Sequence, residues 1–158
     1  MSVDTAPSPK FPKDRPEESL GFSFWQVNNL WQRRLTKALA PLDLTLIQFV
    51  LLAGIARLET SNINVTQVKL AGHQKTDVMM TSQVLRTLEQ KGLISVKPME
   101  GDRRANVLHT TSRGVKRIQK ALDETQSVEN EFFEVLGSRY PKFLSELRLI
   151  VAANEERL

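Results

Sequence analysis

The chain has no cysteine among its 158 residues. This absence excludes disulfide frameworks, thiolate nucleophiles, iron–sulfur clusters, cysteine-ligated zinc and thiol-based redox sensing. Long apolar stretches are also missing, because the longest one lies within residues 47–55 and a membrane helix needs about 20 residues. The N-terminus carries no apolar signal core. We therefore expect a soluble, cytoplasmic protein that makes no contact with a membrane.

Aromatic residues are absent from the central third of the chain, residues 64–120, although the whole chain has ten of them. Proteins usually bind single-stranded nucleic acids by stacking the bases on such side chains. The same third carries eleven Lys or Arg against four Asp or Glu, a net charge of +7, whereas residues 1–63 carry +1 and residues 121–158 carry −4. A basic segment without stacking groups favours duplex DNA as its partner.

Catalytic groups are scarce. His73 and His109 are the only histidines in the sequence, and they fall on different predicted elements, so that no second histidine stands at metal-ligand spacing from either one. The sequence contains no phosphate loop, no dinucleotide-binding glycine motif and no nucleophile elbow. We therefore expect no enzyme activity, no catalytic residue, no metal site and no cofactor.

The N-terminal part predicts an arm followed by two helices. Four of the seven prolines fall in the arm, residues 1–22, which shows no apolar periodicity. From Ser23, apolar residues recur at steps of three and four until Pro41, which indicates a first helix. Thr45 and Gln48 form a capping-box pattern before a helix that is apolar on most sides. This second helix is expected at the centre of the fold.

Two short helices with the layout of a helix-turn-helix come next. Asn64 or Thr66 can cap the first of them, and Gly72 is expected to end it. Thr76 is expected to cap the second, which runs to Lys91. One face of this second helix is expected to be buried, and it carries Val78, Thr81, Leu85 and Leu88.

The remaining segment predicts a hairpin and two further helices. Apolar and polar residues alternate on both sides of a turn predicted over residues 98–104. Thr111 or Ser112 starts a long amphipathic helix that Gly137 is expected to end, and Pro141 marks the start of the last helix.

Two motifs resemble one known family. Residues 101–114 are similar to the D-x-R-x5-L-T-x-x-G signature of MarR-type winged-helix regulators, with Thr110 in place of the usual leucine. Residues 81–94 are similar to the recognition helix of that family and its exit into the wing. The resemblance covers residues 23–157.

The resemblance implies a mainly α fold with a small β-hairpin wing. Residues 45–111 would form the winged helix-turn-helix DNA-binding domain, and residues 23–44 and 112–158 the helical dimerisation region. Such a protein binds pseudo-palindromic DNA as a homodimer, usually as a repressor relieved by a small ligand. Eight of the ten aromatic residues lie in the first and the last two helices or, for Phe22, at the entrance to the first helix, which also suggests packing on a second copy.

Side chains near the N-terminal half of a recognition helix reach base edges in the major groove. Gln83 suits adenine, and Arg86 suits guanine or phosphate unless it is an ordinary surface charge. Met79 and Met80 could contact a thymine methyl, or one of them could pack in the core. The predicted DNA-contacting residues are Thr66, Gln67, Lys75, Met79, Met80, Ser82, Gln83, Arg86, Arg103 and Arg104, with Lys69, Lys97, Arg113 and Lys116 as further backbone contacts.

The hairpin tip and a ligand pocket complete the predicted sites. Arg103 and Arg104 suit the minor groove or phosphates, and the family likeness assigns Asp102 to bracing Arg104. An ordinary exposed turn is the alternative. The family likeness also implies a small aromatic or amphipathic effector near Trp25, Asn28, Trp31 and Phe49, although core packing explains Trp31 and Phe49 equally well.

Two alternatives to a ligand-responsive repressor remain open. A winged-helix module used for protein contacts would keep the same core, but the polar residues Ser82, Gln83 and Arg86 argue against it. A DNA-binding activator without a small-molecule effector would look the same in sequence.

Overall fold

The computed structural model describes Lys10 and residues 15–155, with the side chains of residues 102–104 left aside. The chain forms two compact units, residues 1–33 and residues 34–158, which we describe separately. The first unit holds a short 3-10 helix, Pro16–Glu18, and most of helix α1, Leu20–Leu39. Helix α1 begins before the predicted start at Ser23, because the hydroxyl of Ser19 accepts a hydrogen bond from Phe22 N at 3.4 Å.

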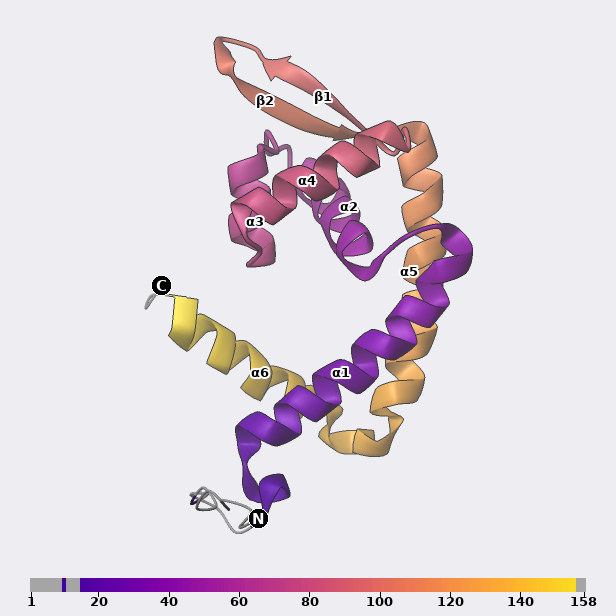
Figure 1. Ribbon diagram of the computed structural model, residues 1–158, viewed down its shortest axis with the longest axis vertical. Coiled ribbons are helices and arrows are strands. Elements are labelled where there is room, and N and C mark those ends of the chain that lie inside the picture. Colours follow the sequence, from indigo (N-terminus) through magenta and orange to yellow (C-terminus); the bar gives the residue numbers. More distant parts are fainter. Residues whose placement is uncertain (1–9, 11–14, 156–158) are drawn as a thin grey trace, which may run out of the picture. The chain divides into compact units, whose positions relative to one another are not determined.

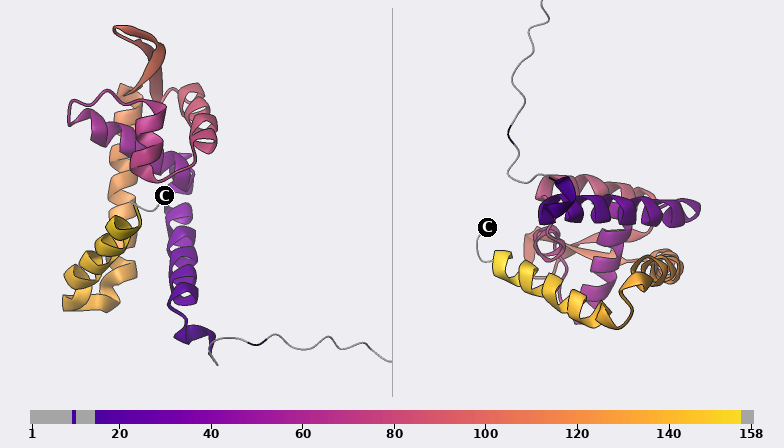
Figure 2. Two further views of the ribbon diagram at one scale, coloured as in Figure 1. Left: turned by 90° about the vertical axis from the view of Figure 1, so that its left-hand side faces the viewer. Right: turned by 90° about the horizontal axis from the view of Figure 1, so that it is seen from below.

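The second unit is mainly helical and contains one antiparallel hairpin, which confirms the predicted fold class. The hairpin lies at the end of the unit where α5 begins, and α6 follows the opposite end of α5 (Figures 1 and 2). After the end of α1, the elements are η2 Ala40–Leu42, α2 Leu46–Glu59, α3 Gln67–Gln74, α4 Val78–Gln90, β1 Ile94–Met99, β2 Asp102–Thr110, α5 Ser112–Phe133, η3 Glu134–Arg139 and α6 Tyr140–Glu155.

Helix α2 forms the centre of the second unit, as its sequence predicts. The capping box is present, with Thr45 and Gln48 exchanging two hydrogen bonds of 3.3 Å. The side chains of Leu51, Leu52 and Ile55 have no exposed surface. Burying one such side chain contributes about 1.5–3 kcal/mol to the free energy of folding. They share one core with residues from every neighbouring element, including Leu70, Leu88, Ile94, Leu108 and Ile118.

The connection between α3 and α4 differs from the prediction at both of its ends. Helix α3 continues past Gly72 to Gln74, and Lys75 takes the positive φ of 55° that we expected a glycine to supply. Helix α4 is capped by Asp77 and not by Thr76, because the carboxylate of Asp77 accepts a 2.9 Å hydrogen bond from Met80 N. The predictions for Gly72 and Thr76 are therefore wrong by a few residues, while the two helices are confirmed.

The turn of the hairpin is shorter than the one predicted over residues 98–104. Strand β1 reaches Met99 and β2 begins at Asp102, so the turn consists of Glu100 and Gly101. Gly101 has a φ of 83°, which glycine adopts without steric cost. The backbone of Leu108 donates a 2.8 Å hydrogen bond to Val65 O, so that β2 is also tied to the segment before α3.

The base of the hairpin is held by a carboxylate at the end of α2. Thr110 N lies 3.2 Å from both carboxylate oxygens of Glu59, and His109 Nδ1 lies 3.2 Å from one of them. An acidic residue in the last turn of a helix is disfavoured by the helix dipole. Glu59 gains these partners instead, and through them it fixes the end of β2 to the core helix.

At Gly114, the first turn of α5 packs closely against the backbone of Leu93, the residue before β1. Thr111 caps the helix by accepting a 3.0 Å hydrogen bond from Gly114 N, and the Thr111 hydroxyl donates to Gly92 O at 2.7 Å. A Cβ atom at position 114 would overlap the carbonyl oxygen of Leu93 and lie 2.9 Å from the methyl group of Thr110. Only glycine therefore allows this close crossing. At the other end, α5 stops at Phe133, before the predicted end at Gly137, and η3 leads into α6.

In the described part of the chain, no single helix combines the length and the apolar character needed to cross a membrane. One pair of consecutive helices, Leu20–Leu42 and Leu46–Glu59, meets that test only when the two are taken together. The second of these is the buried core helix.

We expect Gly114→Ala to lower the free energy of unfolding by about 3 kcal/mol, because the added methyl group cannot enter without moving backbone. Urea denaturation monitored by circular dichroism measures this change. Gly72→Ala is the matched control, since nothing lies within 4 Å of the added Cβ. That control should raise stability by about 0.5–1 kcal/mol. Equal stabilities of the two variants would contradict the close crossing.

We expect Glu59→Ala to loosen the hairpin base, with a loss of about 1 kcal/mol in unfolding free energy and faster hydrogen exchange at Thr110 N. Glu124→Ala removes an exposed carboxylate from α5 and should change stability by less than about 0.5 kcal/mol. The idea of a Glu59 brace is wrong if exchange at Thr110 is equally slow in both variants.

Candidate nucleic-acid interface

The start of α3 is held by two side chains that we predicted to contact DNA. The hydroxyl of Thr66 accepts a hydrogen bond from Lys69 N at 3.3 Å and caps the helix. The side-chain amide of Gln67 donates to Val78 O at 3.1 Å, which links the first turn of α3 to the first turn of α4. Both side chains therefore stabilise the helix-turn-helix corner, the connection between α3 and α4, through hydrogen bonds within the protein.

A buried threonine fixes the entry of α4. The side chain of Thr81 is fully buried. Its hydroxyl donates to Asp77 O at 2.7 Å and lies 2.9 Å from the hydroxyl of Thr76. A buried hydroxyl without partners would be costly, so this pair specifies one arrangement of the corner. The first turn of α4 consequently has a fixed position on the core.

The outward face of α4 carries three of the predicted contact residues in a row. Met79, Gln83 and Arg86 follow one another at helical spacings of four and three and are exposed. Their ridge lies opposite the buried face, which is made by Thr81, Leu85 and Leu88. We call Met79, Gln83 and Arg86 the recognition ridge. The same spacing places Gln90, which sequence analysis did not single out, at its far end.

Neither methionine packs in the core. Met79 is 81% exposed and Met80 is 41% exposed, so the alternative that buries one of them is wrong. Val78, predicted to lie on the buried face, is 44% exposed because it stands at the first position of the helix. Ser82 is half-buried at the edge of the recognition ridge. Large exposed apolar side chains at the start of α4 point to a partner that offers apolar groups there.

Lys75 lies in the turn between the two helices and is exposed, as predicted. Its Nζ lies 3.1 Å from a carboxylate oxygen of Glu155 at the end of α6. Both side chains are about half exposed. Such a surface pair contributes little, about 0–1 kcal/mol, so that a phosphate group can compete for the ammonium group.

The side chains of Asp102, Arg103 and Arg104 lie outside what the structure describes. Their predicted roles at the hairpin tip therefore remain predictions. The described part of the hairpin places the exposed Lys97 on β1, and it shows the Glu59 brace at the base. The brace was missed because Glu59 and Thr110 are far apart in sequence. The signal that could have indicated it is the acidic residue at a helix C-terminus.

The predicted effector residues belong to both units. Trp25, Asn28 and Trp31 lie on the part of α1 in the first unit, where Trp25 stacks on Phe22 at 6.2 Å between ring centroids. Phe49 belongs to the second unit and packs, partly buried, against the core. This packing agrees with the alternative given above, in which Phe49 is a core residue. An effector site formed by all four stays a prediction.

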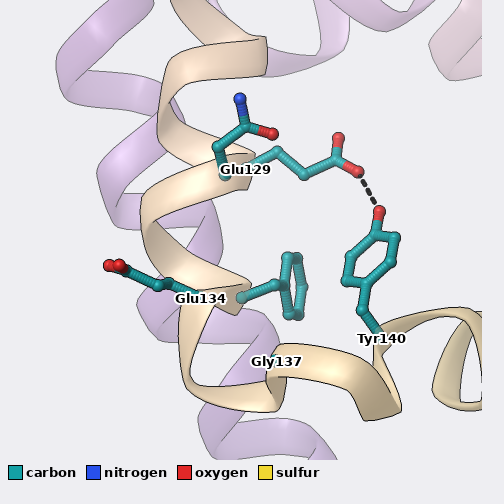
Figure 3. A pocket seen from close by; sticks show the side chains of 6 residues that line it. Glu129, Glu134, Gly137 and Tyr140 are labelled. Carbon is teal, nitrogen blue, oxygen red and sulfur yellow. Dashed lines mark hydrogen bonds between the residues drawn. The ribbon is translucent and has the colours of Figure 1, made fainter.

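A shallow hollow of about 230 Å³ lies at the elbow between α5 and α6. Figure 3 shows Glu129 and Tyr140 pointing toward each other across it, while the carboxylate of Glu134 points away. Tyr140 donates a 2.7 Å hydrogen bond to Glu129. This bond is the main reason that the pKa of Tyr140 is raised above its ordinary 10.0, because the protonated phenol is the form that donates it. The pair joins the two helices.

Comparisons with known proteins agree with this geometry. The MarR family model matches residues 44–105, which run from just before α2 into the hairpin. The HTH-type transcriptional regulator YdcH of Bacillus subtilis (strain 168) is 39% identical over 133 residues, which cover 84% of this chain and 90% of YdcH.

Solved structures show the same fold. A mutant of MarR from E. coli, complexed with operator DNA, is 26% identical with a TM-score of 0.73, over 84% of this chain and 92% of MarR. CouR from Rhodococcus jostii RHA1, bound to p-coumaroyl-CoA, has a TM-score of 0.78 at 18% identity, over 90% of this chain and 96% of CouR.

The segment that the family model matches contains the helix-turn-helix corner, β1 and the start of β2. Identity to YdcH extends well beyond the matched DNA-binding segment, over most of both chains. The chain belongs to the MarR family of transcriptional regulators.

Proposed function

We propose that this MarR-family regulator binds duplex DNA sequence-specifically as a homodimer on a pseudo-palindromic site. It acts as a ligand-responsive repressor in the cytoplasm and has no enzyme activity of its own. The observation that carries the proposal is the recognition ridge, an exposed row of apolar, amide and guanidinium groups on a helix with a fixed entry. The DNA-bound MarR structure, 26% identical, supports it.

The recognition ridge suits the floor of a major groove. An α-helix fits that groove, where adenine offers a paired donor and acceptor to an amide and guanine offers two acceptors to a guanidinium. Gln83 and Arg86 present these groups about one turn apart. Thymine presents an apolar methyl group, which is the natural contact for Met79. The order of these side chains along the recognition ridge therefore favours a particular base sequence, in addition to the general attraction between basic side chains and DNA phosphates.

Basic residues around the ridge supply the contacts to phosphates. Lys75 in the corner and Lys97 on the hairpin are exposed, and Arg103 and Arg104 are predicted to extend this set to the hairpin tip. Phosphate contacts position a protein on DNA and dominate its affinity without carrying sequence information. Residues 64–120 have a net charge of +7, which fits this role.

Exposed apolar side chains on the terminal helices support the homodimer. On α1 these include Leu20, Phe24, Trp25 and Leu30, and on α6 Leu149, Ile150 and Val151. Extended apolar faces of this kind mark association surfaces. Two recognition helices that read successive major grooves must lie about 34–36 Å apart, which one copy cannot provide.

An effector would act by favouring a dimer geometry that does not match the spacing of the grooves. CouR bound to p-coumaroyl-CoA shows that a protein of this fold holds an aromatic acyl ligand. We propose a small aromatic or amphipathic effector for this chain, with Trp25, Asn28, Trp31 and Phe49 as its candidate contacts. Repression itself is supported by the DNA complex of CouR, described as a transcriptional repressor.

In-vitro selection from a pool of random duplexes, followed by gel shift, tests the proposed function. We expect enrichment of an inverted repeat whose half-sites are centred about 10 base pairs apart or at a multiple of that spacing. The affinity should fall steeply between about 50 and 200 mM salt. Failure to enrich any sequence, together with no shift at low salt, would overturn the proposal.

We expect Arg86→Ala to relax the preference at one base pair of each half-site by about 1–3 kcal/mol, because its guanidinium reads a base edge. Lys75→Ala should weaken binding to all sequences alike and reduce the salt slope by about one for each protomer of the dimer. Competition gel shifts on single-base variants of the selected site measure both effects. Glu155→Gln, which removes only the partner of Lys75, should not weaken binding. A uniform loss in Arg86→Ala would reassign Arg86 to phosphate.

We expect wild-type protein to lose about fourfold in affinity when deoxyuridine replaces one particular thymine in one of the two half-sites, the worth of one buried methyl group. Met79→Ala should abolish this penalty, because Met79 is the exposed apolar side chain of the recognition ridge. Met80→Ala is the control and should retain it. A penalty that persists in Met79→Ala would show that another residue contacts the methyl group.

A further inference from the structure

Lys91 stands at the C-terminal end of α4, and its ammonium group is surrounded by acceptors. Nζ donates to Asp43 O at 2.7 Å and to the side-chain oxygen of Gln48 at 3.2 Å, and it lies 3.0 Å from a carboxylate oxygen of Asp43. Only 25% of the Lys91 side chain is exposed. An ammonium group has three donors. All three therefore have partners within the protein.

The acceptors belong to the junction between α1 and α2. Asp43 follows η2 with a φ of 52°, a left-handed conformation that aspartate tolerates better than most residues. Gln48 is the N3 residue of the α2 capping box. In addition, the guanidinium of Arg117 on α5 donates to Leu42 O. Cationic side chains from α4 and α5 thus hold one short segment of backbone.

This junction shares one hydrophobic core with the end of α1, since Leu39 and Leu44 both belong to that core. Within the second unit, the last turns of α1 bury Leu35 and Leu39, which are 2% and 0% exposed. Leu39 belongs to the same core as Leu51 and Leu88. A displacement of the α1 end would therefore move the acceptors of Lys91, and with them the end of α4.

The arrangement argues against a simpler role for Lys91. A lysine that contacts a DNA phosphate needs an ammonium group that can extend into solvent. Exposed lysine side chains meet this condition, because they keep their charged group in water. Breaking three short contacts, one of them to a carboxylate, would offset the gain from one phosphate contact. The position of Lys91 just after the recognition helix is therefore better used to hold that helix.

We propose that Lys91 is a positioning residue for DNA recognition. It fixes the end of the recognition helix to the α1–α2 junction, and it thereby sets the angle at which the recognition ridge meets DNA. In a dimer joined through the terminal helices, this angle determines which spacing between half-sites is bound. The inference rests on the proposed function and adds to it a residue that transmits dimer geometry to the ridge.

The test compares two operators on the same protein. One is the inverted repeat selected by wild-type protein, and the other carries one additional base pair at its centre, which shifts and rotates the half-sites relative to each other. The ratio of their dissociation constants is the spacing penalty. Because both DNAs are measured with one preparation, any loss of folded protein cancels from this ratio. A merely structural role of Lys91 would leave it unchanged.

We expect a spacing penalty of about tenfold or more in the wild type and of about threefold or less in Lys91→Met, which keeps the apolar stem and removes the ammonium group. Lys120→Met removes an exposed lysine of α5 and should retain the wild-type penalty. Combining Lys91→Met with Asp43→Asn should reduce the penalty no further than Lys91→Met alone, because the ion pair that Asp43→Asn removes is already lost in Lys91→Met.

Three outcomes would overturn the inference. The first is a spacing penalty that is the same in Lys91→Met and wild type. The second is a uniform loss of affinity in Lys91→Met with a salt slope reduced by about one for each protomer, which would make Lys91 a phosphate contact. The third is wild-type binding that shows no spacing penalty at all. Failure of the wild type to select any DNA is a different result, since it would overturn the proposed function instead.

Discussion

Burial of α2 on most of its sides is the constraint on which the rest of the second unit depends. A helix that is apolar around most of its circumference cannot face water, so α3, α4, the hairpin and α5 must all cover it. Leu51, Leu52 and Ile55 have no exposed surface. Each covering element buries one face in this contact and leaves its other face free. The outward direction of the recognition ridge follows from the inward direction of Thr81, Leu85 and Leu88.

Polar groups then fix the angles that apolar packing leaves open. Apolar contacts are not directional, whereas hydrogen bonds select one geometry. Thr76 with Thr81 fixes the entry of α4, Lys91 fixes its end, and Glu59 fixes the hairpin. In each case a side chain bonds to backbone or to a buried hydroxyl near the end of an element. The surface that meets DNA is thus supported by polar contacts on the protein side of the same helices.

Local patterns predicted much of this fold, and the reasons differ from element to element. The capping box at Thr45 and the apolar character of α2 are local signals, and both are confirmed. Between α3 and α4, Thr76 and Asp77 are equally good caps in sequence, and burial of Thr81 decides between them by engaging the hydroxyl of Thr76. Glu59 and Lys91 gain their roles from partners more than forty residues away, which no periodicity reveals. The exposure of both Met79 and Met80 was not predicted either, because helical spacing suggested that one of two adjacent methionines could pack in the core.

The two-residue turn of the hairpin also determines where this protein can change length. Glu100 and Gly101 are exposed, and nothing lies within 4 Å of a Cβ placed on Gly101. Below the turn, the register shifts once between Pro98 and Met99, and from Pro98 paired with Asn106 to Ile94 paired with Thr110 the strands pair regularly. The bond from Leu108 to Val65 holds this regular part in place. Insertions are therefore better tolerated at the tip than in the regularly paired part of the hairpin, since loop extension costs little free energy while a register slip turns side chains to the wrong face. Lengthening the tip would extend the reach of the hairpin without altering the core beneath it.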